Sequence, residues 1–161
     1  MLVAIALGCS SSPSAAVDLR NTSYDCSTSI VAAGTDCTGA AWRHPNLRFV
    51  GGSADLCWDE AVPADALSTP ETKVVDAYDL DDEHQVAIVS DSGGGIGICM
   101  YAYFFNRGHC ELAYAFGDRS RSQQPQLTPE GTVAFAYRER GLEDASCCPQ
   151  VQRRIEWYPE R

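Results

Sequence analysis

The second half of the chain alternates between apolar and polar positions, and turn residues separate the alternating stretches. A period of two residues, enriched in Val, Ile, Tyr and Phe, predicts strands. Tight glycine-containing turns between the stretches favour neighbouring strands that run antiparallel. Strands are therefore expected over residues 47–50, 73–80, 85–90, 96–105, 110–117, 132–139 and 153–159.

The first third of the chain has a different pattern. Residues 17–26 predict a short helical entry, and Ser53 precedes acidic residues as an N-cap precedes a first helical turn. A second short helix is expected over residues 53–62, before a loop marked by Pro63 and Pro70. The predicted fold is α+β, a mainly antiparallel β-sheet with short N-terminal helices, stapled by disulfides. An all-β fold is the alternative.

A turn centred on Arg107 predicts a register for the hairpin around it. Phe104 would lie opposite Cys110, and side chains alternate between faces along each strand. Cys99 would then lie on the face opposite to Cys110, so no bond is expected between these two cysteines. Both faces of the hairpin are apolar, so the sheet should be covered on both sides. One face is expected to carry Met100, Ala102, Phe104, Cys110, Leu112, Tyr114 and Phe116, and the other Cys99, Tyr101, Tyr103 and Phe105.

The first residues are typical of an export signal. Residues 2–7 are apolar, and Gly8 and Cys9 follow them as the small residue and cysteine of a bacterial lipobox do. Cys9 is then the predicted lipidation site, and residues 10–16, rich in Ser, Pro and Ala, form a tether. The expected organisation is a signal-like segment at 1–9, the tether at 10–16 and one domain at 17–161. A buried first strand with an ordinary cysteine is the alternative for the first segment.

Eight cysteines in 161 residues favour an oxidised, exported protein over a metal-binding one. The chain has no C-x-x-C pair, and its three histidines lack the spacing of a zinc site. If Cys9 carries lipid, seven cysteines remain, and one of them has no partner within the chain. The candidates for disulfides are Cys26, Cys37, Cys57, Cys99, Cys110, Cys147 and Cys148.

The net charge of −10 narrows the classes of partner. Nucleic-acid binding needs the opposite sign, and an anionic membrane surface repels such a chain, so contact with a membrane is expected only through a lipid anchor. Between residues 55 and 83 there are ten acidic residues and one base, Lys73. This stretch predicts a solvated face, and the alternative is a cation site or a surface for a basic protein partner.

Two motifs partly match known functional sites, one of a serine protease and one of a calcium loop, and each lacks a residue that its site requires. Residues 90–97 contain the Asp-Ser-Gly-Gly of trypsin-like proteases, but Ser90 replaces the first glycine, and a glycine-rich turn between strands is the better interpretation. Asp79, Asp81 and Glu83 have the 1-3-5 spacing of a calcium loop, but His84 stands where the loop needs glycine. No cofactor is therefore predicted, with calcium at these three carboxylates as the alternative. A third group consists of four aromatic residues: Tyr101, Tyr103, Tyr114 and Phe105. We expect these rings to pack in the core, and an aromatic binding patch is the alternative.

Near the end of the chain, Cys147 and Cys148 stand side by side before Pro149. Adjacent cysteines on extended backbone point in opposite directions, so each should bond to a different layer. Together with the strand at 132–137 and with Ile155 and Trp157, this segment resembles the C-terminal signature of LppP/LprE-type lipoproteins of mycobacteria and related actinobacteria. The resemblance implies an envelope lipoprotein of unknown molecular function, and it supplies no catalytic residues.

The sequence therefore predicts an exported or lipid-anchored cell-envelope protein with a binding or structural role and no catalytic activity. One alternative is a secreted inhibitor or ligand-binding module that uses the acidic face. Another is a small calcium-dependent extracellular hydrolase that uses Asp79, Asp81 and Glu83.

Overall fold

The computed structural model describes residues 16–32, 47–55, 72–91, 99–118, 121–139 and 151–160. Over these residues the chain forms twelve strands and no helix, so the predicted α+β fold with N-terminal helices is wrong and the protein is mainly β. Residues 17–26 form a turn, in which Asn21 N–H donates to Asp18 O, followed by the short strand β1 (Ser23–Tyr24).

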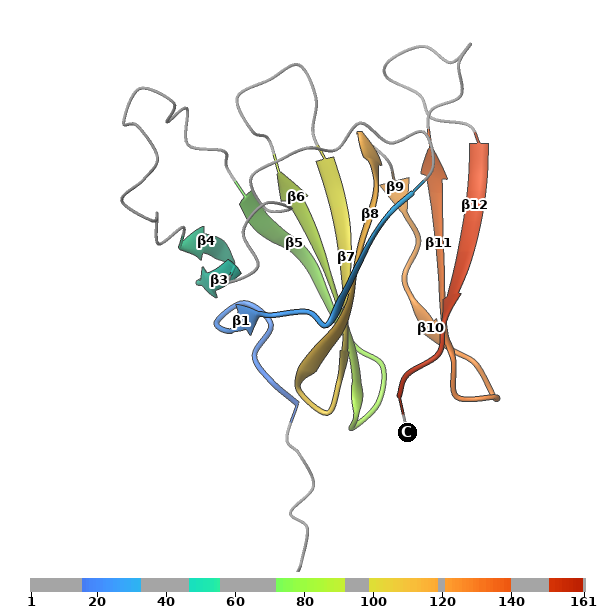
Figure 1. The fold of residues 1–161 in the computed structure, drawn as a ribbon, viewed down its shortest axis with the longest axis horizontal. Coiled ribbons are helices and arrows are strands. Elements are labelled where there is room, and N and C mark those ends of the chain that lie inside the picture. Colours follow the sequence, from blue (N-terminus) through green and yellow to red (C-terminus); the bar gives the residue numbers. More distant parts are fainter. Residues whose placement is uncertain are drawn as a thin grey trace, which may run out of the picture.

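Four long strands form the centre of the larger sheet (Figure 1). They follow one another in the chain and pair antiparallel: β5 (Thr72–Asp79), β6 (His84–Asp91), β7 (Cys99–Asn106) and β8 (His109–Asp118). Each coincides within a few residues with an alternating stretch of the sequence. Most of β7 and β8 is buried, because apolar side chains on both faces find a covering layer.

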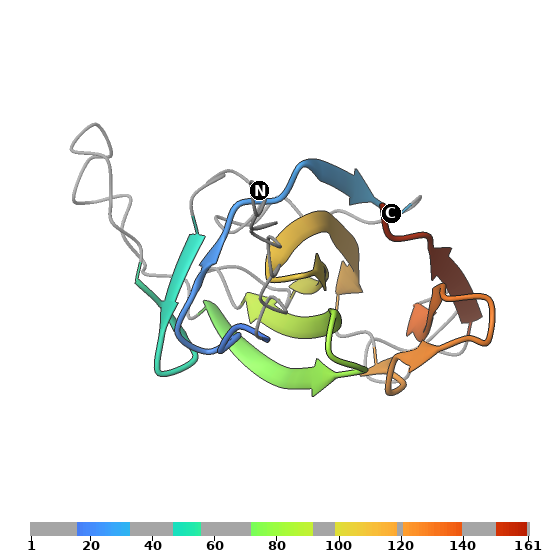
Figure 2. The same cartoon turned by 90° about the horizontal axis from the view of Figure 1, so that it is seen from below.

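The edges of this sheet come from the N-terminal part of the chain. The strand order is β1-β3-β4-β5-β6-β7-β8-β2, with β3 at Leu47–Val50, β4 at Ser53–Asp55 and β2 at Thr28–Val31. β2 pairs parallel to β8, and the other pairings are antiparallel. Only three residues separate β1 from β2, yet they occupy opposite edges. The sheet must therefore curl, and Figure 2 shows the blue segment with β1 and β2 running opposite the green strands β5 and β6.

The curled sheet encloses an inner core. Tyr24 lies at its centre, with its ring 4.5 Å from Phe49, 4.8 Å from Tyr103 and 4.9 Å from Phe105 between centroids. The other buried members are Leu19, Val74, Ala87, Val89, Tyr101, Cys110, Ala113 and Ala115.

A second sheet covers the outer face of β6 to β8. It consists of β9 (Arg121–Ser122), β10 (Gln126–Leu127), β11 (Val133–Glu139) and β12 (Val151–Trp157), and both β9 and β10 pair with β11. Between the two sheets lies an outer core, in which the rings of Phe116 and Phe135 approach to 5.1 Å. Its other buried members are Ala32, Val86, Ile88, Ala102, Phe104, Tyr114, Val133, Tyr137 and Trp157. The prediction that both faces are covered is confirmed.

Ser53 begins strand β4 and does not cap a helix. Gly51 and Gly52 have φ values of 60° and 84°, and Val50 pairs with Ser53 across them. Two consecutive residues with positive φ make the mirror-image turn that joins antiparallel strands, so the chain reverses here. The helix predicted over 53–62 is therefore wrong at its start, and residues 56–62 lie outside the described ranges.

The hairpin between β7 and β8 has a different register from the expected one. Its turn contains two residues, Arg107 and Gly108, and Phe105 rather than Phe104 lies opposite Cys110. Glu111 is then the extra residue of a β-bulge, which moves Cys110 onto the inner face. The predicted face of Cys110 is wrong, and the other residues assigned to the two faces lie as expected.

Candidate functional site

Polar side chains gather where the β5–β6 and β7–β8 turns lie together. We call this the hairpin end of the larger sheet. His84 pairs with Asn106, and Asn106 pairs with His109, so these residues follow one another across three strands on one face. Arg107 N–H donates to Glu83 O at 2.7 Å, and its guanidinium lies 3.2 Å from the Glu83 carboxylate. These contacts join the two turns and hold Arg107 at its positive φ of 51°.

Asp81 organises the β5–β6 turn. Its Oδ1 accepts the N–H groups of Glu83 at 2.9 Å and His84 at 2.6 Å, and the His84 Nδ1 lies 2.8 Å from the same oxygen. Burial raises the pKa of Asp81, but the hydrogen bonds from His84 and Glu83 outweigh it and hold the pKa below its usual value. The carboxylate therefore stays charged and fixes the imidazole through Nδ1.

The His84 ring also forms a T-shaped contact with Trp157 on β12, with centroids 6.2 Å apart and planes at 78°. A histidine oriented by a carboxylate resembles the base of a nucleophilic enzyme, which also needs a hydroxyl or thiol on the other ring nitrogen. Across the described residues, the His84 side chain hydrogen-bonds to Asp81 alone. Within the described ranges, the pair closes the β5–β6 turn and contacts Trp157.

The three carboxylates predicted to bind calcium have separate protein partners. Asp79 Oδ1 accepts a hydrogen bond from Gln85 Nε2 at 2.7 Å, Asp81 holds His84, and Glu83 pairs with Arg107. No group of three or more His, Cys, Asp or Glu side chains in the described ranges is arranged to hold a metal ion. The structure therefore does not assemble Asp79, Asp81 and Glu83 into a ligand set.

On the inner face, Gln85 holds the N-terminal segment by its backbone. Its Oε1 accepts Val17 N–H at 3.1 Å, and its Nε2 donates to Val17 O at 2.9 Å. Gln85 is only 2% exposed, and its buried polar atoms form hydrogen bonds to the Val17 backbone and to Asp79. We call this pair of bonds the Val17 contact.

On the outer face, Asn106 and Glu111 hold the C-terminal segment in the same manner. Asn106 Nδ2 donates to Glu160 O at 2.7 Å, and Glu160 N–H donates to Glu111 Oε2 at 3.1 Å. Asn106 Nδ2 also donates to Glu111 Oε1 at 2.7 Å, which fixes the two side chains relative to each other. We call this set the Glu160 contact. Both ends of the described chain are thus bound at the hairpin end through their backbones.

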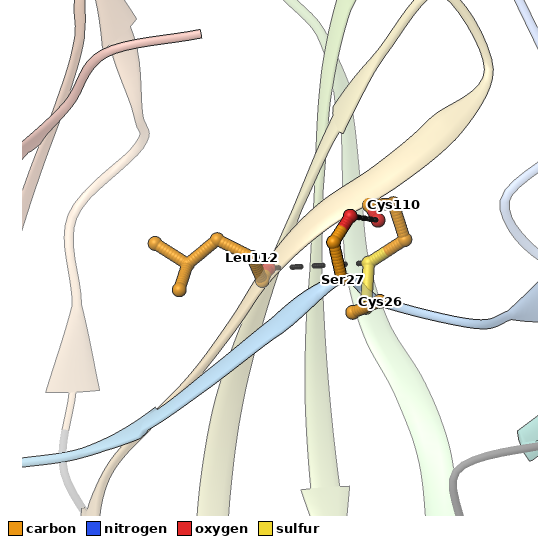
Figure 3. Close-up of a disulfide and its surroundings, with 4 residues drawn as sticks. All are labelled: Cys26, Ser27, Cys110 and Leu112. Carbon is orange, nitrogen blue, oxygen red and sulfur yellow. Dashed lines mark hydrogen bonds between the residues drawn. A yellow bond between two sulfur atoms is a disulfide. The ribbon is translucent and has the colours of Figure 1, made fainter. Parts of the chain in front are cut away.

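A disulfide fastens the N-terminal segment to β8 (Figure 3). Cys26 bonds to Cys110, 84 residues further along the chain, and Ser27 N–H donates to Cys110 O at 3.2 Å. The prediction that Cys99 and Cys110 do not bond to each other is confirmed. Its reason differs from the expected one, because both cysteines belong to the inner side but lie near opposite ends of the β7–β8 hairpin. Cys99 is also disulfide-bonded.

The other residues singled out from the sequence lie in the two cores or outside the described ranges. Tyr101, Tyr103 and Phe105 are buried in the inner core and Tyr114 in the outer one, so these rings pack in cores and form no surface patch. The remaining predicted positions lie outside the described residues: Cys9, Cys37, Cys57, Cys147, Cys148 and residues 92–98, which include most of the glycine-rich motif.

Three residues that hold the chain at the hairpin end were not predicted from the sequence: Gln85, Asn106 and Glu111. The sequence does contain a sign of their role. Gln85 and Asn106 are amides in apolar strands, so they are expected to be buried, and a buried amide needs hydrogen-bond partners. Glu111 likewise interrupts the apolar pattern of β8. The partners themselves were not readable, since Val17 and Glu160 contribute only backbone atoms.

No family model, no curated protein and no solved structure matches this chain. Within the described ranges, no helix has the length and apolar character needed to cross a membrane.

Proposed function

We propose that the protein is an extracytoplasmic, lipid-anchored or secreted, envelope protein whose role is binding or structural and not catalytic. The observation that carries the proposal is the Cys26–Cys110 disulfide. Disulfides persist in oxidising compartments outside the cytoplasm, and Cys99 is a third disulfide-bonded cysteine besides Cys26 and Cys110. The resemblance of the C-terminal segment to actinobacterial envelope lipoproteins agrees with this location.

The attachment of the N-terminal segment supports an anchored form. Val17 is bound by Gln85, Arg20 Nη1 donates to Val74 O at 2.9 Å, and Cys26 is covalently bound to β8. A lipid on Cys9 would therefore be connected to the folded domain through a segment fixed at three points. A load applied to such an anchor is carried by the large sheet and not by the segment alone.

The chemistry of the hairpin end supports a binding or structural role. Its amides and carboxylates, Gln85, Asn106, Glu111 and Asp81, hold turns and backbone segments by hydrogen bonds. Recognition of this kind uses charge and hydrogen-bond geometry, without a bond being made or broken.

The test is intact mass with peptide mapping, before and after reduction, of protein produced from its full reading frame in an actinobacterial host. We expect a diacylglyceryl mass on the peptide that begins at Cys9 and a bridged Cys26–Cys110 peptide pair. The Cys9→Ala variant should lose the lipid mass, partition into the aqueous phase and keep the same bridge. A bridged Cys9 would contradict the anchored form and leave a secreted protein. Unmodified thiols throughout would contradict the location itself.

A further inference from the structure

The Glu160 contact holds one residue by both of its backbone groups. The C=O of Glu160 accepts from the Asn106 side chain and its N–H donates to the Glu111 side chain, so two side chains supply the pair of bonds that a backbone makes in a sheet. The Glu160 side chain takes no part in these two bonds. Asn106 and Glu111 therefore recognise a backbone and not a side chain.

The two recognising side chains are themselves held in place. Asn106 is 8% exposed, lies in register between His84 and His109, and donates to Glu111 as well as to the backbone of Glu160. Glu111 occupies the bulge between the Phe104 and Phe105 pairings. A bulge re-aims a side chain, and here it turns this carboxylate toward the bound segment.

The segment that fills this position is otherwise loosely covered. Trp157 is 7% exposed and its ring packs 5.3 Å from that of Phe104, but Tyr158 is 69% exposed and Glu160 is exposed. Beyond Trp157, the contacts that hold the chain on the β7–β8 hairpin are therefore mainly those to the backbone of Glu160.

We propose that Asn106 and Glu111 form a binding site for an extended polypeptide segment, and that Glu160 of the same chain fills this site in the present structure. The proposal deepens the binding role proposed above. It does not depend on Cys9, so a failed lipidation test would leave it standing, and its own failure would leave the compartment proposal standing. The site requires a residue with both N–H and C=O, and proline cannot satisfy it.

The energies set the conditions of a test. Two hydrogen bonds, one of them to a carboxylate, hold a free peptide only weakly, so we expect binding to this site at roughly millimolar concentration. The chain's own segment acts at an effective concentration of about the same order. A free peptide is therefore expected to enter once the chain's own segment has lost one of its bonds.

The experiment uses full-length protein with [15N]asparagine, because the chain has three asparagines and Asn106 is one of them. The Glu160→Pro variant removes the N–H that donates to Glu111, and Glu160→Ala is the matched control that keeps it. Asn21, whose Nδ2 donates to Asp18 Oδ2 at 2.7 Å, reports whether the remainder of the fold is unchanged. The added probes are acetyl-Tyr-Pro-Glu-Arg-amide and acetyl-Tyr-Pro-Pro-Arg-amide.

We expect E160P to shift the side-chain amide signals of Asn106 and not those of Asn21, and E160A to shift neither. Titration of E160P with the first peptide should return the Asn106 signals toward their wild-type positions, and the second peptide should have no effect. If the signals move in E160P and neither peptide returns them, the contact serves the chain's own fold only, and the proposal fails. It fails equally if E160P leaves Asn106 unchanged.

Should E160P also move the Asn21 signals, the same two peptides are titrated into the wild-type protein at roughly ten times the concentration. A shift confined to Asn106, and caused by the first peptide alone, supports the site. No shift, or the same shift with both peptides, overturns it.

Discussion

The inner and outer cores lie on the two faces of one sheet, but they are closed in different ways. The inner core is closed by the same sheet as it curls, and the segment that completes it is bound covalently through Cys26 and Cys110. The outer core is closed by a second sheet that forms its ladders separately. Among the described residues, the curl of one sheet and the Cys26–Cys110 bond therefore close the first core, and packing between two sheets closes the second.

Each core also contains a tyrosine hydroxyl with a partner inside the protein. Tyr24 donates to Leu19 O at 2.6 Å in the inner core, and Tyr114 and Tyr137 hydroxyls lie 3.0 Å apart in the outer one. Burial raises the pKa of Tyr24, and burial together with the bond to Tyr114 raises that of Tyr137. The two cores thus bury similar chemistry, and what differs is how each is enclosed.

The largest effect should come from emptying one core at a time. Phe135→Ala removes a fully buried ring of the outer core, and Phe105→Ala removes its counterpart in the inner core. Each should lower the free energy of unfolding by about 3–5 kcal/mol. In hydrogen exchange, Phe135→Ala should release β11 and β12 while β5 to β8 stay protected, because the described strands of the two sheets form separate ladders. Phe105→Ala should speed exchange in both sheets, and equal patterns in the two variants would contradict the comparison.

A smaller effect should follow from cutting the covalent closure. Cys26→Ala combined with Cys110→Ala should lower the free energy of unfolding by about 2–5 kcal/mol, since the bond closes a long loop in the unfolded chain. Urea unfolding measures the loss, and exchange should speed first in β1 and β2. Ser27→Ala, a neighbour whose hydroxyl lies 3.5 Å from Cys110 O, is the control and should change little. Faster exchange in β11 and β12 than in β2 would show that connectivity does not distinguish the two cores.

The smallest effect concerns alkaline pH. Because the folded-state pKa of Tyr24 lies above the unfolded value of about 10, the phenol stays protonated in the fold while it ionises in the unfolded chain. This contribution is present in full below about pH 10 and is lost as the pH rises above it. Tyr24→Phe should lower stability by about 1 kcal/mol at pH 7 and flatten the alkaline decline.

Melting temperatures between pH 7 and 11 measure that decline. Tyr158→Phe is the control, since Tyr158 is exposed and belongs to neither core. Equal slopes of melting temperature against pH in the two variants would contradict a contribution from the burial of Tyr24.

How much was predictable differs between these regions. The alternating stretches at 73–80, 85–90 and 132–139 form β5, β6 and β11. A period of two in β-branched and aromatic residues matches the alternation of side chains along a strand and no helical period. The helix expected from Ser53 failed because the turn at Gly51 and Gly52 reverses the chain, and this tertiary constraint outweighs a weak capping pattern. The placement of β2 parallel to β8 could not be predicted, since nothing local to residues 28–31 specifies partners 84 residues away at 112–115.

By itself, the sequence determined that this chain forms strands with two apolar faces and that its cysteines favour an oxidising compartment. These properties are local or compositional, and they depend on side-chain period and residue type alone. Only the tertiary structure decided that the sheet curls, that Cys26 meets Cys110, and that Asn106 and Glu111 hold Glu160. The reason is that each of these outcomes joins segments that lie far apart in the chain. The contact to Glu160 also uses backbone atoms, which every residue carries, so no residue type marks it. A one-residue bulge at Glu111 decides which face the neighbouring side chains occupy, and no local pattern shows it.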